Sequence, residues 1–379
     1  MVSAAPAAWP RRALERLAAE WLLLAFALLA LALAVLDPQP LEQYRRWLRL
    51  PTLAGLLGLM IAIQGIRDSG LVQRLAALLA ARAHSLRGLG LLLVAATALA
   101  STVLTNDVSL FLLVPLTVAI GGISNLPVLR MVVLEALAVN AGSTLSPIGN
   151  PQNLLLWQYG HLPFLGFAAA MLPAAATMFA LVAALAWCWL PRGRIAIEAA
   201  ALDGHRVSPA LAALSLLALA GMVLMMEHGH ALLGALLLLA PFALLERRTL
   251  ARLDWLLLAT FAAIFLGLGH FAALPAVQHA LDGLDFGRPA VVYLAGIAAS
   301  QLISNVPATV LLVERAPDTV ALAVAVNVGG FGVAIGSLAN LIALRLARQP
   351  GGMRLLHLVS VPFLLLCAPL VYLVTRWLG

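Results

Sequence analysis

The chain has 379 residues, of which 63% are hydrophobic and 10% are charged, whereas an average soluble domain is about 25% charged. Because a soluble fold needs enough polar side chains to cover its surface, this composition argues against a soluble protein and favours helices in lipid. The formal net charge is +7. The basic residues lie in short segments between apolar runs, which is typical of membrane anchoring and not of a nucleic-acid-binding surface.

Apolar runs along the chain approach the roughly 20 residues that cross about 30 Å of hydrocarbon. The first, at 21–35, follows several arginines and has features of a signal peptide, but we expect a retained helix because no secreted domain follows it. The other runs lie at 53–66, 88–100, 110–120, 128–141, 165–190, 209–226, 231–245, 255–269, 291–300, 320–328 and 355–374. The predicted fold class is an all-α polytopic membrane protein with about ten transmembrane helices.

Two further segments, 71–83 and 276–284, are predicted to be amphipathic helices at the membrane interface. Other segments are too short, or too rich in Pro, Gly and Asn, to cross the membrane alone. In hydrocarbon every backbone N–H and C=O needs a partner, so broken helices persist only where protein or a water-filled site covers them. Such interruptions therefore indicate where a substrate binds.

An internal repeat aligns the polar segments of the two halves. In what we call the tip alignment, ASTVLTND at 100–107 lies over ASQLISNV at 299–306. In the break alignment, NAGSTLSPIGNPQN at 140–153 lies over NVGGFGVAIGSLAN at 327–340, with Asn, Gly, Ile, Gly and Asn at equal spacing. The matches come in the same order in both halves, which predicts a duplication.

The predicted domains are a first transmembrane repeat with an N-terminal helix in 1–200 and a second repeat in 201–379. Each repeat combines scaffold helices, an apolar re-entrant hairpin with a polar tip, and a helix broken within the membrane. We expect the repeats to be inverted, with a binding site near the bilayer midplane between them, because duplicated broken helices are typical of secondary transporters.

At these residues the sequence resembles the ion transporter superfamily of arsenite permeases, sodium/proton antiporters, citrate transporters and divalent anion/sodium symporters. The resemblance runs from about residue 50 to the C-terminus and is closest to a short bacterial group of anion permeases. In the symporter branch, Ser-Asn-Thr tips and Gly-rich breaks together bind sodium and a substrate carboxylate. Here Thr105-Asn106-Asp107 and Ser304-Asn305-Val306 occupy the tips, and 146–153 resembles the first break.

Two positions depart from the symporter pattern. Val306 replaces a hydroxyl residue at the second tip, and no proline precedes Asn340 in the second break. The second break, at 335–339, is more similar to the arsenite permease branch, as is the pair Asn106-Asp107. The resemblance therefore leaves the choice between sodium and proton as the coupling ion open.

The candidate substrate- and ion-binding residues are the polar and glycine residues of the tips and breaks. A polar group bracketed by apolar sequence costs several kcal/mol if unpaired, although Ser, Thr and Asn also cap short half-helices. Glycines let the backbone leave the helix and expose carbonyls to a cation. The predicted site is Thr105, Asn106, Asp107, Asn140, Gly142, Ser143, Ser146, Gly149, Asn150, Asn153, Ser304, Asn305, Asn327, Gly329, Gly336 and Asn340.

Two acidic residues lie in or near the predicted site. Asp107 is a functional candidate because a carboxylate in the membrane is costly, and it would bind a cation or carry a proton; its alternative role is a buried partner of Arg130. Glu135 lies shortly before Asn140. One interpretation is that Glu135 faces the same interior as Asn140. We favour the other, a structural pair with Arg130 five residues earlier, although this spacing is imperfect for one helical face.

The sequence favours a secondary transporter of a small inorganic or organic anion, working by alternating access in the bacterial inner membrane. The alternatives are a sodium/proton antiporter and an arsenite efflux permease, the latter with an ATPase partner. An enzyme is not expected, because no HExxH, GxSxG or Cys/His pairing is present. We expect no cofactor beyond a coupling ion, sodium or proton. The expected partners are the anion and the lipid bilayer, with a homodimer implied by the resemblance alone.

Overall fold

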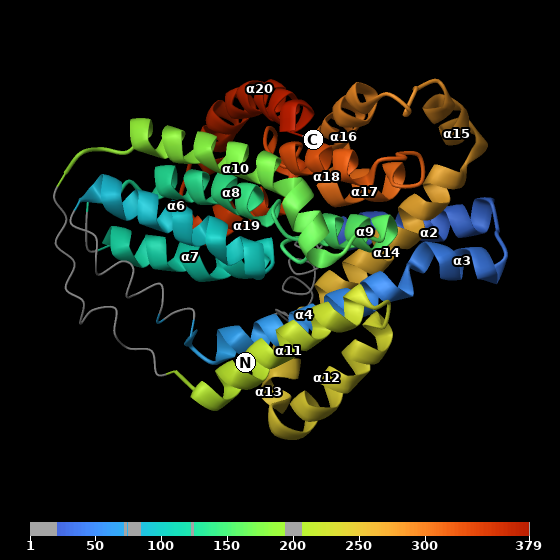
Figure 1. The fold of residues 1–379 in the computed structure, drawn as a ribbon, viewed down its shortest axis with the longest axis horizontal. Coiled ribbons are helices and arrows are strands. Elements are labelled where there is room, and N and C mark those ends of the chain that lie inside the picture. The colour runs from blue at the N-terminus through green and yellow to red at the C-terminus, as the bar shows by residue number, and fades with distance from the viewer. Residues whose placement is uncertain (1–20, 72–73, 75–84, 123–124, 194–206, 379) are drawn as a thin grey trace, which may run out of the picture. The chain divides into compact units, whose positions relative to one another are not determined.

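The computed structural model describes residues 21–71, 74, 85–122, 125–193 and 207–378. Within these ranges the regular elements are all helical (Figure 1), so the predicted all-α class is confirmed. By their contacts the described residues form two compact units, one within Met1–Leu53 and Asp254–Gly283 and one within Ala54–Leu253 and Leu284–Gly379. The predicted repeat boundary at residue 200 lies outside the described residues, and the two repeats stay a prediction.

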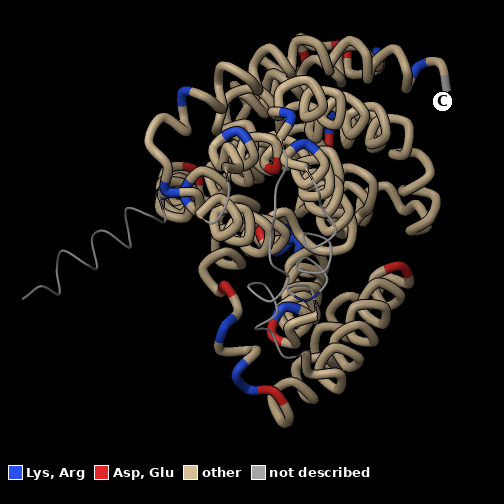
Figure 2. Tube along the Cα trace, turned by 90° about the vertical axis from the view of Figure 1, so that its left-hand side faces the viewer, with Lys and Arg blue, Asp and Glu red and all other residues tan. Residues whose placement is uncertain are grey.

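Six helical segments are long and apolar enough to cross a membrane. They are Leu41–Asp68, Leu86–Val103, Phe164–Trp189, Pro209–Glu227, Trp255–Ala273 and Gly352–Trp377. Six shorter apolar helices of 10–17 residues accompany them in the described part of the chain. Figure 2 shows long stretches of helix without a charged residue. The protein is therefore a polytopic membrane protein, and the count of about ten spans remains a prediction.

The smaller unit contains α2 (Trp21–Leu36), α3 (Leu41–Leu48), α14 (Trp255–Ala273) and α15 (Pro275–Asp282). Helix α14 packs against α2 and α3. A Cβ atom at Gly267 would lie 2.9 Å from the carbonyl oxygen of Phe26, so a glycine is needed for this close approach. Helix α15 falls on the predicted interfacial segment 276–284, whereas 71–83 lies almost entirely outside the described residues.

In the smaller unit one histidine of α14 is buried against α3. The ring of His270 stacks on Trp47 with 4.8 Å between centroids, and its Nε2 lies 3.2 Å from Asp37 Oδ2. Tyr44 meets the same ring edge-on. Stacked aromatic rings and a carboxylate partner together fix the orientation of this imidazole.

The larger unit begins with α4 (Leu50–Asp68), whose first turn belongs to the smaller unit. It also contains α11 (Pro209–Glu227), α12 (Ala231–Leu245) and α13 (Arg247–Ala251). Glycines on α4 face α11. A Cβ atom added at Gly58 would lie 2.4 Å from Met222 Sδ, and one added at Gly65 would lie 2.2 Å from Ser215 Oγ. Small residues on one face let two membrane helices approach closely.

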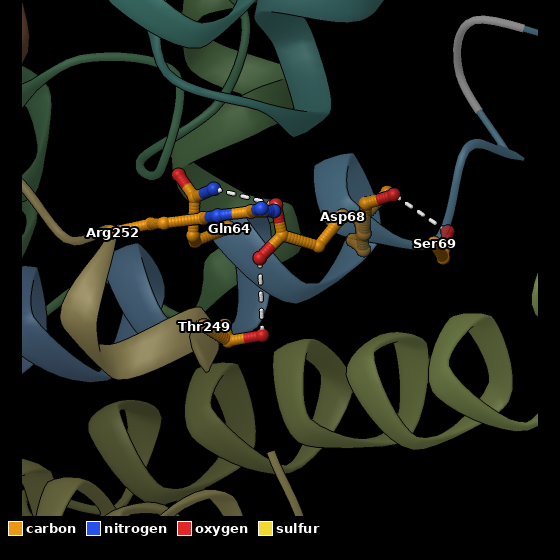
Figure 3. Close-up of polar contacts among 6 residues, drawn as sticks. Gln64, Asp68, Ser69, Thr249 and Arg252 are labelled. Atoms are coloured by element: carbon orange, nitrogen blue, oxygen red, sulfur yellow. Dashed lines mark hydrogen bonds and ion pairs between the residues drawn. The ribbon is translucent and has the colours of Figure 1, made fainter. Parts of the chain in front are cut away.

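The end of α4 is tied to α13 by the carboxylate of Asp68 (Figure 3). This carboxylate accepts hydrogen bonds from Gln64 Nε2 at 3.0 Å, Thr249 Oγ1 at 3.1 Å and Arg252 Nη1 at 3.0 Å. The Asp68 side chain is 12% exposed. Three donors on one nearly buried carboxylate make it the main polar link between these helices.

We expect Asp68→Ala to lower the free energy of unfolding by about 1–3 kcal/mol, because the hydroxyl of the buried Thr249 loses its acceptor. The matched control is Asp285→Ala, which removes an exposed pair with Arg288 and should cost about 0–1 kcal/mol. Thermal unfolding in detergent measures both variants. Equal melting temperatures for the two variants would contradict this assignment.

The rest of the larger unit consists of two sets of helices in chain order. The first set is α6 (Leu86–Val103), α7 (Asn106–Gly122), α8 (Val128–Ser143), α9 (Pro151–Gly160) and α10 (Phe164–Trp189). The second is α16 (Pro289–Ile303), α17 (Asn305–Leu312), α18 (Thr319–Val328), the 3₁₀ turn η2 (Ala334–Gly336), α19 (Leu338–Ala347) and α20 (Gly352–Leu378). Helix α8 lies at the centre of the first set, packed by α6, α7 and α10 (Figure 1). All its residues from Met131 to Ser143 are buried.

Candidate functional site

The first predicted tip lies between α6 and α7, and α7 begins at Asn106. The backbone N–H of Asn106 donates to the carbonyl of Gly149 at 3.2 Å, which joins this tip to the first break. Asn106 Oδ1 is buried and has no hydrogen-bond partner among the described residues. Thr105 and Asp107 are partly buried beside it. An unpartnered buried amide oxygen at this position is available to a ligand.

The second tip is Ser304, between α16 and α17. Its φ of 76° and ψ of 155° are unusual for a residue with a side chain, and such strain costs about 1–3 kcal/mol and concentrates at ligand sites. Ser304 Oγ is buried and has no hydrogen-bond partner in the described ranges. Asn305 Oδ1 accepts from the N–H of Val306 at 2.9 Å. Each tip therefore holds one buried polar atom that the protein leaves unpaired.

Both predicted breaks are interruptions of helix. In the first, α8 ends at Ser143 and α9 begins at Pro151, where Asn150 Oδ1 caps the new helix by accepting from the N–H of Asn153 at 2.9 Å. In the second, α18 ends at Val328 and α19 begins at Leu338. The carbonyl groups and N–H groups freed by such interruptions must be satisfied by neighbouring protein or by a ligand.

Glycines bring each break against the preceding hairpin. A Cβ atom at Gly142 would lie 2.0 Å from the carbonyl oxygen of Ala98, and one at Gly329 would lie 2.6 Å from Ser300 Cβ. Gly149 and Gly336 are equally confined, since their Cβ atoms would lie 2.6 Å and 2.8 Å from backbone carbonyl oxygens. The predicted glycines are therefore required for close packing of the breaks.

Five of the predicted asparagines meet in one hydrogen-bonded group, the asparagine cluster: Asn140, Asn150, Asn153, Asn327 and Asn340. All are buried, with at most 2% of each residue exposed. Asn140 Nδ2 donates to Asn340 Oδ1 at 3.2 Å, and Asn327 Nδ2 donates to Asn153 Oδ1 at 2.6 Å. Asn150 Nδ2 donates to Asn327 Oδ1 at 2.8 Å and to Ser143 Oγ at 3.0 Å. The cluster joins the two breaks directly.

The cluster's hydrogen bonds occur at equivalent positions of the break alignment. The side chains of Asn140 and Asn327 each donate to the carbonyl four residues earlier, at 2.9 Å and 2.7 Å. Those of Asn153 and Asn340 each donate to the carbonyl ten residues earlier, at 3.0 Å in both cases. Across the halves, the first asparagine of each break donates to the last asparagine of the other. The two breaks thus contribute matching hydrogen bonds.

The helices that follow the tips and breaks also pack across the halves. Helix α7, which follows the first tip, packs against α19, which follows the second break. Helix α17, which follows the second tip, packs against α9, which follows the first break. Four helices therefore begin at the tips and breaks, and their N-terminal ends carry the partial positive charge of the helix dipole.

The structure adds two polar residues that the sequence analysis did not select. Thr102 Oγ1 donates to the carbonyl of Gly142 at 3.0 Å, and Gln301 Nε2 donates to that of Gly329 at 2.6 Å. The tip alignment places Thr102 over Gln301, so it held a signal for both. The hydroxyl of Ser146 also donates to the carbonyl of Thr102. These side chains hold the breaks against the hairpins.

Two residues of α20 contribute no pattern to the internal alignments, yet their side chains accept hydrogen bonds from the second break. Ser360 Oγ accepts from the N–H of Gly332 at 2.8 Å, and His357 Nε2 accepts from that of Ala334 at 3.1 Å. Helix α20 lies outside the aligned segments. The first break has more polar residues of its own, whereas the second takes part of its support from this helix.

The expected pair of Glu135 with Arg130 is wrong. Arg130 is exposed, donates to the carbonyl of Trp189 at 3.3 Å and lies 5.5 Å from the centroid of its ring. Glu135 is buried and bonds with Thr117 instead. A spacing of five residues does not bring two side chains to the same face of a helix, and the exposed arginine finds partners near the surface.

The chemistry available at the site is that of amides, hydroxyls and backbone groups, with the carboxyl group of Asp107 at the first tip. Among the described residues, no group of three or more His, Cys, Asp or Glu side chains is suited to a metal ion. Amide N–H groups and helix N-termini bind anion oxygens. Amide and backbone carbonyl oxygens are ligands for a hard cation. Groups of this kind can bind small ions without covalent chemistry.

The chain is similar over most of its length to known membrane proteins. A family profile described as citrate transporter matches residues 13–321. The chain is 41% identical over 321 residues to the inner membrane protein YbiR of Escherichia coli, covering 85% of this chain and 86% of that protein. It is 29% identical to the uncharacterized transporter MJ0456 of Methanocaldococcus jannaschii, over 86% of this chain and 88% of the relative. A 125-residue segment, 33% of this chain and 26% of the relative, is 34% identical to the silicon efflux transporter LSI3 of Oryza sativa. The chain belongs to the citrate transporter family and is a membrane transporter, not an enzyme.

Proposed function

We propose that the protein is a secondary transporter of a small anion in the bacterial inner membrane, driven by a proton or sodium gradient. The observation that carries the proposal is the asparagine cluster, which joins two broken helices through direct amide hydrogen bonds. Four helices begin at the adjoining tips and breaks, and their N-terminal ends favour negative charge. Broken helices of this kind form the binding sites of secondary transporters.

We also propose that the two halves are inverted repeats that exchange access to the site between the two sides of the membrane. The matching hydrogen bonds at equivalent positions of the break alignment support this duplication. So does the reciprocal packing of α7 on α19 and of α17 on α9. A movement of one half relative to the other changes which side of the cluster meets water, as alternating access requires.

The tips supply the ligand contacts in this proposal. Asn106 Oδ1 and Ser304 Oγ are the buried atoms left unpaired at the two tips. Asp107, in the first turn of α7, is the acidic residue of the first tip and belongs to the ion-binding part of the site. The protonated or sodium-bound state of this part would offset the charge of the anion during crossing.

The experiment is a transport assay in proteoliposomes with the purified protein. Citrate, succinate, sulfate, phosphate, arsenite and silicic acid are added in turn, with and without a sodium or pH gradient, and charge movement and uptake are recorded. We expect one anion class to produce uptake that depends on one cation, and Asp107→Asn to reduce it. Proton movement driven by sodium with every anion absent would replace the proposal with an antiporter.

A further inference from the structure

Glu135 lies at the centre of α8, five residues before Asn140, and none of its surface is exposed. The hydroxyl of Thr117 on α7 donates to its Oε1 at 2.5 Å. Its second oxygen, Oε2, is buried and has no hydrogen-bond partner among the described residues. The carboxyl group therefore has one neutral partner and one open position.

The helices packed against α8 are α6, α7, α10, α18, α19 and α20. Their described charged or titratable residues, with Arg130 of α8 itself, are Arg87, Asp107, Arg130, Cys188, Arg345, Arg354, His357, Cys367, Tyr372 and Arg376. None of them forms a hydrogen bond or an ion pair with Glu135 in the described structure. No cationic side chain of the described helices around α8 therefore balances a negative charge on this carboxyl group.

An ionised carboxylate buried without a counter-charge costs far more than a neutral one. Glu135 is accordingly neutral in this conformation, with Oε1 in a hydrogen bond with the Thr117 hydroxyl. A separation of 2.5 Å lies at the short end of hydrogen bonds between oxygen atoms. The carboxyl group can ionise only where water or a cation reaches it.

The position of this hydrogen bond links it to the proposed site. Helix α7 begins at the first tip and carries Thr117, whereas α8 ends at the first break and carries Glu135. The bond joins the two elements that build the first half of the site. Helix α19 of the second half packs against both α7 and α8, so a movement of that half would change the surroundings of the carboxyl group.

The second half of the chain has no counterpart of this pair. The break alignment, extended toward the N-terminus, places the buried Leu322 over Glu135. The tip alignment, extended toward the C-terminus, places Leu312 over Leu113. Leu312 is the last residue of α17, so this helix ends before a position that would match Thr117. A carboxyl group present in one half alone is not needed to build the arrangement that both halves share.

We propose that Glu135 is a proton-binding site of the transporter, occupied in this conformation and emptied when the second half moves away from α7 and α8 and water reaches the carboxyl group during the transport cycle. The step is one proton transfer, in which the carboxyl oxygen releases its proton to water and takes it back on return. This proposal rests on the proposed transport function and names the proton as its coupling ion.

The first arm of the test needs no substrate. Infrared spectra of the protein in lipid are recorded over a range of pH for the wild type, Glu135→Gln and Glu42→Gln, where Glu42 is an exposed control. We expect a protonated-carboxyl band that disappears at alkaline pH in the wild type and in Glu42→Gln, and that is missing from Glu135→Gln. A band unchanged by Glu135→Gln, or one that persists at every pH, overturns the proposal.

The second arm uses the anion that the wild type transports from the panel above. We expect Glu135→Gln to lose about tenfold or more of the uptake driven by a pH gradient, and to retain anion exchange at equal pH on both sides. Undiminished pH-driven uptake in Glu135→Gln overturns the proposal. If the wild type transports none of the anions, the proposed function fails, and the infrared arm decides the proton site by itself.

Discussion

Asn327→Ala is expected to reduce transport to background and to lower the stability of the protein. The Asn327 side chain makes hydrogen bonds with Asn150, with Asn153 and with the carbonyl of Ala323. Its removal leaves buried amide groups of the first break unpaired, at a cost of about 1–3 kcal/mol for each group. Transport in proteoliposomes and the melting temperature in detergent measure the two effects.

The matched control is Asn125→Ala, at an exposed position before α8, which should leave both measurements unchanged. Asn140→Ala is a sharper comparison, because Asn140 bonds across the halves only with Asn340, whereas Asn327 bonds with two residues of the first break. We therefore expect Asn327→Ala to cost more than Asn140→Ala. An equal loss of stability and transport in both variants would show that the number of hydrogen bonds across the halves does not determine the size of the effect.

Gly142→Ala is expected to produce a large loss of stability, about 3 kcal/mol. The added Cβ would lie 2.0 Å from the carbonyl oxygen of Ala98 and 2.5 Å from Ser101 Oγ. The first of these atoms belongs to the backbone of α6, so relief requires a shift of the helix itself. The amount of folded protein after purification and its melting temperature measure the effect.

Two glycine variants serve as controls for Gly142→Ala. Gly221→Ala on α11 places its Cβ in open space and should be neutral or slightly stabilising. Gly58→Ala meets Met222 at 2.4 Å, but through the flexible end of a methionine side chain that can move aside. Were Gly58→Ala as damaging as Gly142→Ala, close approach to the backbone would not be the cause.

The polar tips and breaks could be predicted from the sequence because Asn, Gly and Pro stand out in an apolar chain and recur in two alignments of the halves. Spacing within one segment also explains why Asn150 caps α9. The pairing of Asn140 with Asn340 could not be predicted, since no local pattern records which residues of two distant segments meet. Length alone also could not settle the number of spans, because helices such as α17 and α18 are too short for that rule.

Glu135 shows where reasoning from sequence spacing fails. The nearest arginine along the chain, Arg130, was the expected partner, but it faces the surface. The actual partner, Thr117, belongs to another helix, and one hydroxyl among many in the sequence gives no signal of its own. The hydrogen bonds from the second break to Ser360 and His357 could not be predicted either, because α20 lies outside the aligned segments of the repeat.

The hydrogen bonds across the two halves affect how the protein folds during its synthesis. Asn140 and Asn340 lie 200 residues apart in the chain, which a ribosome covers in about 10–40 s at roughly 5–20 residues per second. During that interval the first half is already made, yet its amides have no partners from the second. Until then, water or the insertion machinery must supply hydrogen-bond partners for the amides of the first break. The first half can therefore complete its folding only when synthesis of the chain is nearly finished.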